Sequence, residues 1–173
     1  SASAEIMLYG NYDDDSAADI AAMVAQIIPE STAPALPDLK VLKLAANEQL
    51  QYAVDVPHDD AVVAWYLQGA GDTWEDQAAT ALTGQIMKSG FFQQLRTEQQ
   101  LGYVVSAFSW PQYDVPGMVM LVQSPVADAG AVASAMEQFM QGVVPDLDEA
   151  QFVRHRKALV NEILRPDKNM WER

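Results

Sequence analysis

An arginine and a tyrosine in residues 91–103 are the side chains best suited to chemistry on a peptide. Arg96 is the only arginine in the first 153 residues, and Tyr103 follows it by seven positions. A guanidinium and a phenol both donate hydrogen bonds to carbonyl oxygens. Where a peptide bond is cleaved, such donors stabilise the tetrahedral oxyanion. The structural alternative is that Arg96 pairs with surface carboxylates while Tyr103 is half-buried core.

The elements around this pair must bring both side chains to one place. Residues 91–100 predict a further helical turn, and residues 103–110 predict a strand that Tyr103 opens. Gly102 stands between them and permits a bend or a close backbone approach. Residues 111–117 predict a turn-rich loop, and residues 118–124 return as the hairpin partner.

The histidines exclude a complete zinc-peptidase site in this chain. Only His58 and His155 occur, 97 positions apart, whereas a helical zinc site needs two imidazoles about one turn apart. His58, followed by Asp59 and Asp60, is either a metal ligand or a histidine in a turn. His155 lies in a basic run, which disfavours a metal, and we expect solvated helix surface there.

The sequence gives little support for a calcium site or for a serine catalytic triad. The trio Asp13, Asp14 and Asp15 lacks the spacing and the glycine of a calcium loop, so a solvated helix start is favoured. No Gly-x-Ser-x-Gly motif supports a serine triad. The absence of cysteine excludes disulfides, thiolate nucleophiles and cysteine metal sites.

Charge narrows the class of partner. The net charge is −14, with a local +3 in residues 154–173 and −17 in the rest. A surface with this much negative charge repels phosphate backbones and anionic membranes. We therefore expect no nucleic-acid or membrane partner. No apolar run approaches the roughly 18 residues of a membrane span. The opening sequence lacks a basic stretch followed by a long apolar run, so we expect no signal peptide in it.

Apolar periodicity and capping residues predict the remaining elements. Strands are expected at residues 5–10, 41–44, 51–56 and 61–68. A helix should start at Ser16, with a buried stripe of Ile20, Val24, Ile27 and Ile28. A second should be capped by Asp72 with Glu75 three residues on and stop near Gly90; a third should run from Asp128 to Gly142. Asp148 should open the last helix, with inward-facing Phe152, Leu159, Val160 and Ile163.

This order predicts an α+β fold with a single, mostly antiparallel sheet and helices packed on one face. The length of 173 residues suits one domain, which we expect to span residues 1–165. Residues 166–173 look like the start of a truncated further helix, so we expect a fragment of a larger chain.

Residues 91–103 resemble the C-terminal half of the pitrilysin and insulin-degrading enzyme family of zinc metallopeptidases. A Leu-Arg-Thr-x-x-Gln-Leu-Gly-Tyr motif is typical there, and the order of elements over residues 5–165 is also similar. The residues that match the motif are Leu95, Arg96, Thr97, Gln100, Leu101, Gly102 and Tyr103. The strand after the motif and the returning Gln123-Ser124 fit the same pattern.

The resemblance implies a later domain, most similar to the fourth, because the first domain carries the inverted zinc motif that this chain lacks. It implies that zinc and the catalytic base lie outside this chain, and that sister domains and peptide substrates are its partners. By motif position, Arg96 and Tyr103 would contact substrate and the transition state at the distant zinc. It also suggests a periplasmic location, with the cytoplasm as the alternative.

We therefore expect a non-catalytic C-terminal domain of a zinc-dependent endopeptidase, which forms part of the substrate chamber. Alone, the chain should neither hold catalytic zinc nor cleave peptides. The alternative is an inactive family-like subunit that serves assembly or peptide binding only.

Overall fold

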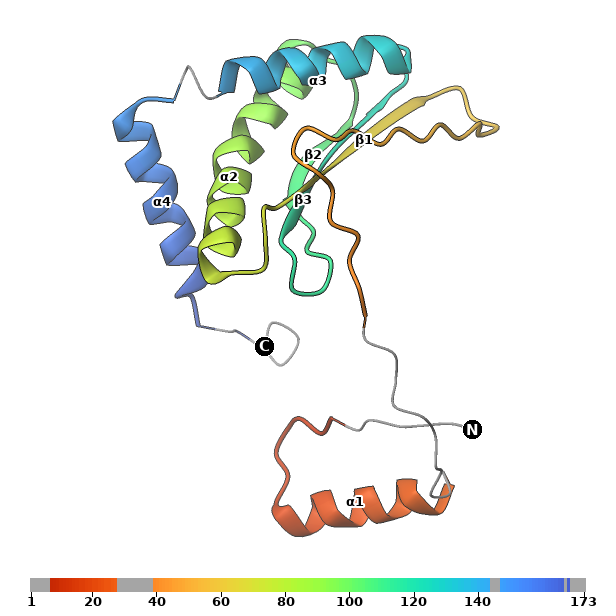
Figure 1. The fold of residues 1–173 in the computed structure, drawn as a ribbon, viewed down its shortest axis with the longest axis vertical. Coiled ribbons are helices and arrows are strands. Elements are labelled where there is room, and N and C mark those ends of the chain that lie inside the picture. The colour runs from red at the N-terminus through yellow and green to blue at the C-terminus, as the bar shows by residue number, and fades with distance from the viewer. Residues whose placement is uncertain (1–6, 28–38, 144–146, 167, 169–173) are drawn as a thin grey trace. The chain divides into compact units, whose positions relative to one another are not determined.

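The computed structural model describes residues 7–27, 39–143, 147–166 and 168. The chain divides into two units, Lys40–Arg165 and the pair of segments Ser1–Leu39 and Pro166–Arg173. The elements are labelled in Figure 1. In order they are α1 (Asp14–Ile27), β1 (Ala61–Gln68), α2 (Trp74–Phe92), the π-helix η1 (Gln93–Glu98), β2 (Val104–Ser109), β3 (Gly117–Ser124), α3 (Ala129–Val143) and α4 (Glu149–Ile163). The predicted domain limits, at 165 and 166–173, stay predictions.

The unit Lys40–Arg165 has the predicted α+β architecture. Its three strands form one antiparallel sheet in the order β1-β3-β2, so β3 is central. The β2–β3 hairpin pairs Val104 with Gln123, and β1 pairs Val62 with the same residue. Helices α2 and α3 cover one face of the sheet, and α4 packs against α2 (Figure 1).

A single core joins the sheet to these helices. Alternation in β1 directs Val63, Trp65 and Leu67 toward it, as the sequence predicted. The rings of Phe91 and Phe139 meet edge to face, with centroids 5.3 Å apart. The buried core residues come from α2, η1, both hairpin strands and α3: Met87, Phe91, Leu95, Val105, Ala107, Met118, Met120, Val122, Val132, Met136 and Phe139. The buried residues of α3, the helix predicted from Asp128 to Gly142, are Val132, Ala135, Met136 and Phe139.

Two predicted strands are wrong. Residues 41–44 and 51–56 form no strand, although both have apolar alternation. Tyr52 is 89% exposed, because no neighbouring strand pairs with this segment to bury one of its faces. At residues 42–44 the side-chain amide of Gln68 makes the hydrogen bonds that a neighbouring strand would otherwise make. It donates to Leu42 O and accepts from Leu44 N–H, both at 2.9 Å. Of the strand predicted at 5–10, residues 7–10 are irregular and the rest lies outside the described residues.

The predicted helix starts are displaced. Asp13, not Ser16, caps α1: its Oδ1 accepts the Ser16 N–H at 2.9 Å. Thr73, not Asp72, caps α2, because its extended backbone lets the hydroxyl accept from Asp76 N–H while donating to Asp76 Oδ2 at 2.8 Å. The start at Asp148 is confirmed, with a complete capping box.

Helix α2 ends two residues beyond Gly90, close to the predicted stop. It continues to Phe92 and passes directly into η1. A Cβ at Gly90 would lie 3.4 Å from the Phe139 ring, an ordinary van der Waals contact, so packing against α3 does not require a glycine there. Helix α3 likewise continues one residue past Gly142, to Val143.

Helices α1 and α4 bury less than their patterns predicted. In α1, Ile20 and Val24 are half-buried and Ile27 is 79% exposed, while Ile28 lies outside the described residues. In α4, Phe152 and Leu159 are half-buried, but Val160 and Ile163 are exposed. Helix α4 packs chiefly on α2, which covers only part of the apolar side of α4.

Candidate functional site

The segment that carries Arg96 is the π-helix η1, anchored by a fully buried leucine. Leu95 is 0% exposed, and its carbonyl accepts the Leu101 N–H at 3.0 Å where the helix ends. Gln100, between them, has a φ of 54°, in the left-handed region that non-glycine residues rarely adopt. π-helical turns and such backbone strain are frequent at functional sites. After this turn, residues 102 and 103 lead into β2, which begins at Val104.

Arg96 helps to close this turn. Its Nη1 donates to Gly102 O at 2.7 Å, and its guanidinium carbon lies 5.8 Å from the centroid of the Phe92 ring. Both contacts hold the half-buried side chain over its own loop. Within the described part of the chain Arg96 makes no ion pair, contrary to the structural alternative. A guanidinium has five N–H groups, so this arrangement leaves donors for a ligand.

Tyr103 stands just before β2 and is exposed rather than half-buried. Its exposed fraction is 61%, so the interpretation as core is wrong. Arg96 and Tyr103 line one open hollow on the surface. Its lining consists of Arg96, Thr97, Gln100, Gly102, Tyr103 and Pro125. Five motif positions and the residue after β3 therefore surround the same space.

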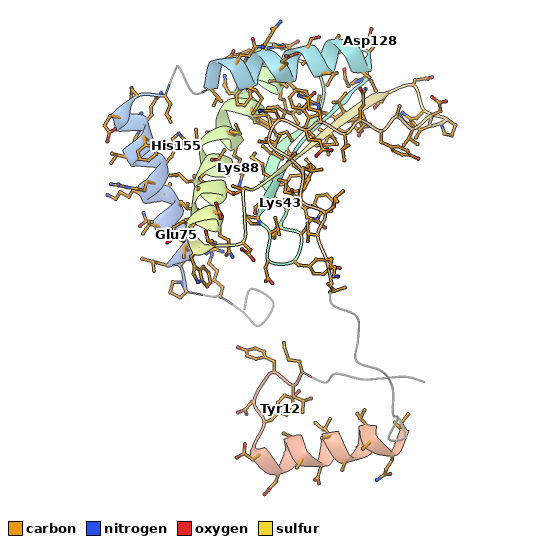
Figure 2. The ribbon with its side chains drawn as sticks, in the orientation of Figure 1. Tyr12, Lys43, Glu75, Lys88, Asp128 and His155 are labelled. Carbon is orange, nitrogen blue, oxygen red and sulfur yellow. The ribbon has the colours of Figure 1, made fainter. Side chains whose placement is uncertain are left out.

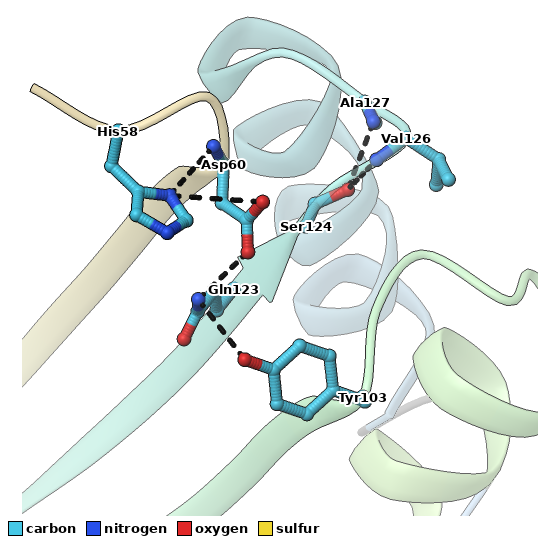
Figure 3. Close-up of polar contacts among 7 residues, drawn as sticks. All are labelled: His58, Asp60, Tyr103, Gln123, Ser124, Val126 and Ala127. Carbon is cyan, nitrogen blue, oxygen red and sulfur yellow. Dashed lines mark hydrogen bonds and ion pairs between the residues drawn. The ribbon is translucent and has the colours of Figure 1, made fainter.

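Gln123 holds the Tyr103 hydroxyl and is itself bound to Asp60, a connection that sequence analysis did not predict. Gln123 Nε2 donates to Tyr103 Oη at 3.3 Å and to Asp60 Oδ2 at 2.8 Å (Figure 3). Asp60 precedes β1 and is only 15% exposed. The available signal was a glutamine that directly follows the apolar run Met118–Val122 within one strand.

His58 belongs to the turn that carries Asp60. Its Nδ1 accepts the Asp60 N–H at 3.0 Å, so the neutral ring carries its proton on Nε2. The 3.7 Å approach of Nδ1 to Asp60 Oδ1 is therefore not an ion pair in this state. In the same region Ser124 Oγ accepts from Ala127 N–H at 2.9 Å and from Val126 N–H at 3.3 Å (Figure 3). These bonds fix the exit from β3, where Pro125 lines the hollow.

The remaining candidate residues are not among those that line the hollow. His155 is on α4 and is half-buried, although Arg154 and Arg156 beside it are exposed (Figure 2). In the described ranges no three or more histidine, aspartate or glutamate side chains are grouped to hold a metal ion.

Hydrogen bonds from Ser16 lower the pKa of Asp13, and burial raises the pKa of Tyr66; neither group lines the hollow. No helix in residues 7–27, 39–143 and 147–166 is long and apolar enough to span a membrane.

Comparison with known proteins covers the whole of this site. A family described as "PQQ synthase PqqF-like, C-terminal lobe domain 4" matches residues 82–173. The chain is 27% identical to the insulin-degrading enzyme of Drosophila melanogaster over 97% of its length, which covers 18% of that enzyme. It is 38% identical to the coenzyme PQQ synthesis protein F of Klebsiella pneumoniae over 50% of its length, or 11% of that protein.

Structural comparison agrees. The crystal structure of pitrilysin superposes with a TM-score of 0.58 at 26% identity, over 67% of this chain and 13% of that one. The chain thus spans less than a fifth of the length of these relatives. The family match, the relatives and the shared fold lead to one assignment: this chain is a C-terminal domain of the pitrilysin and insulin-degrading enzyme family.

Proposed function

We propose that this chain is a non-catalytic C-terminal domain of a zinc-dependent endopeptidase and forms part of the wall of its substrate chamber. Its relatives include the insulin-degrading enzyme and protease 3, and the described residues offer no metal site of their own. The zinc, held by another domain, would supply the electrophile and activate water. The periplasmic location stays a prediction, with the cytoplasm as its alternative.

The observation that carries the proposal is the shared hollow. Arg96 and Tyr103, seven residues apart, come from different elements and still line one open space. Both are hydrogen-bond donors, and Tyr103 is exposed to a ligand. We propose that they bind substrate carbonyl oxygens and stabilise the charge that develops when the peptide bond is attacked. An inactive subunit that only binds peptides would use the same donors. The parent sequence distinguishes the two alternatives: an active peptidase carries His-x-x-Glu-His in another domain, and an inactive subunit lacks it.

Removing the phenol hydroxyl tests the role of Tyr103. In the full-length peptidase, Tyr103→Phe should lower kcat/KM at least about fivefold, because a transition-state hydrogen bond is lost. Tyr113→Phe is a matched control, since Tyr113 is also 61% exposed but lies in the β2–β3 turn, outside the hollow. Steady-state kinetics with a peptide substrate gives both values. A loss below about fivefold for Tyr103→Phe would contradict the proposal.

Arg96 is tested in the same assay. Arg96→Ala should also lower kcat/KM at least about fivefold. Because Arg96 bonds to Gly102 O, the melting temperature must be measured too. Arg96→Lys keeps the charge but not the planar fork, so it should recover only part of the loss. Full activity of Arg96→Ala in a stably folded enzyme would exclude the role.

A further inference from the structure

The Tyr103 hydroxyl lies at the end of a chain of hydrogen bonds built from three separate segments. Gln123 is on the central strand β3, Asp60 precedes β1, and Tyr103 precedes β2. Gln123 Nε2 reaches both partners, Asp60 Oδ2 at 2.8 Å and Tyr103 Oη at 3.3 Å (Figure 3). One amide nitrogen thus connects a largely buried carboxylate to an exposed phenol.

The chemistry of the carboxylate sets the direction of these bonds. An ionised carboxylate only accepts hydrogen bonds, so the Gln123 amide must present its NH₂ group to Asp60. The second hydrogen of that NH₂ group serves Tyr103, whose oxygen is therefore the acceptor. A phenol has a single hydrogen, which must then point to another acceptor. In the described part of the chain the Tyr103 hydroxyl donates to no protein group.

Neighbouring groups hold Asp60 and the backbone before Tyr103 in position around Gln123. Asp60 is 15% exposed, and its backbone N–H is bound to His58 Nδ1 at 3.0 Å. On the other side, Gly102 packs so closely on β3 that a Cβ there would meet the Gln123 carbonyl oxygen. The backbone just before Tyr103 is therefore seated on the same residue whose side chain holds its hydroxyl.

We propose that Gln123 is a positioning residue: by donating to the Tyr103 oxygen, it turns the phenol hydrogen outward to the hollow, where a peptide carbonyl accepts it. This inference rests on the proposed role of Tyr103. Asp60 is the group that prevents the amide from turning over. A glutamine with its oxygen toward Tyr103 would instead accept the phenol hydrogen and remove the donor from the hollow.

A polarity-reversing variant of the full-length peptidase tests this. Asp60→Asn combined with Gln123→Glu keeps net charge and side-chain size, but the introduced carboxylate accepts both from the introduced amide and from the phenol. Its kcat/KM should fall to within about twofold of Tyr103→Phe, with the loss mainly in kcat. Gln123→Met, which removes both donor and acceptor, lets the phenol rotate freely and should cost less than the reversal. A merely structural role predicts the opposite order.

The combination with Tyr103→Phe makes the test decisive. Without the phenol hydrogen, the Asp60→Asn/Gln123→Glu pair should lower kcat/KM by less than about twofold. Wild-type activity of the reversed variant, or losses that multiply with Tyr103→Phe, would overturn the role of Gln123 while the proposed function stands. If Tyr103→Phe itself is fully active, the proposed function fails and this inference fails with it. Melting temperatures of all variants establish that each one is folded.

Discussion

At the scale of single residues, the closest backbone approach in the site is at Gly102. An added Cβ would clash with the carbonyl oxygen of Gln123, far inside van der Waals contact. The neighbouring atoms are backbone, which cannot turn aside as a flexible side chain does. The sequence suggested a bend or a close approach at this glycine, and the close approach is what the structure contains. The first residues of β2 can pair with β3 only because position 102 has no side chain.

Replacing this glycine should therefore separate the strands. We expect Gly102→Ala to destabilise the fold by roughly 2 kcal/mol or more, because the start of β2 must move off β3. Gly84→Ala is the matched control: Gly84 lies within α2 and a Cβ there meets nothing within 4 Å. That change should stabilise by up to about 1 kcal/mol through helix propensity. Urea unfolding measures both, and equal effects would contradict the steric account.

At the scale of elements, the start of α1 depends on an ionised side chain. Asp13 Oδ1 accepts the Ser16 N–H, and hydrogen bonds from the hydroxyl and backbone of Ser16 lower the pKa of Asp13 below its ordinary value. A pKa lowered by folding means that the ionised form stabilises the helix. This stabilisation is present above the ordinary aspartate pKa and is lost as the pH falls through the lowered one.

The helix start should therefore loosen in acid. We expect the helical ¹³Cα chemical shifts of the first turn of α1 to decline below about pH 4. Asp13→Asn is the control, because an asparagine caps a helix without titrating, and its difference from wild type isolates Asp13 from Asp14 and Asp15. Identical acid profiles for the two proteins would show that the carboxylate has no such role.

Element prediction succeeded where local pattern and long-range pairing agree. The alternation of Val63, Trp65 and Leu67 is confirmed because β3 pairs with that strand and helices cover its inner face. The alternation of Tyr52 and Val54 looks equally good, yet it forms no strand. Alternation shows only that a segment suits a half-buried surface, and a strand exists where a partner pairs with it.

At the scale of the whole molecule, one core couples the sheet to α2, η1 and α3. Phe91 is 0% exposed in this core, while the adjacent Phe92 is 46% exposed and contacts Arg96. Phe91→Ala should cost about 3–5 kcal/mol, a large share of the 5–15 kcal/mol of a typical domain. Phe92→Ala should cost about 1 kcal/mol, chiefly the contact with the guanidinium. Chemical denaturation checks this, and similar losses for both would contradict the assignment of the core.

The whole chain should also lack catalytic zinc. Only two histidines occur, and the described residues bring no metal-binding group together. Elemental analysis of the purified chain should therefore find less than stoichiometric zinc, and peptide cleavage should be absent. One tightly bound zinc per chain would contradict the proposal that another domain supplies the metal. As a control, the zinc content is also measured after brief treatment with a low concentration of chelator, which removes only loosely bound ions.

The sequence by itself determined the family, the α+β class, the hairpin and the pair Arg96 and Tyr103, because motif, alternation and caps are local properties of a chain. Only the tertiary structure decided which residues surround that pair. Gln123 lies 63 positions from Asp60 and 20 from Tyr103, and the register of β3 between β1 and β2 brings them together. Strand order and register depend on how a sheet pairs across long sequence separations, and no local spacing encodes that.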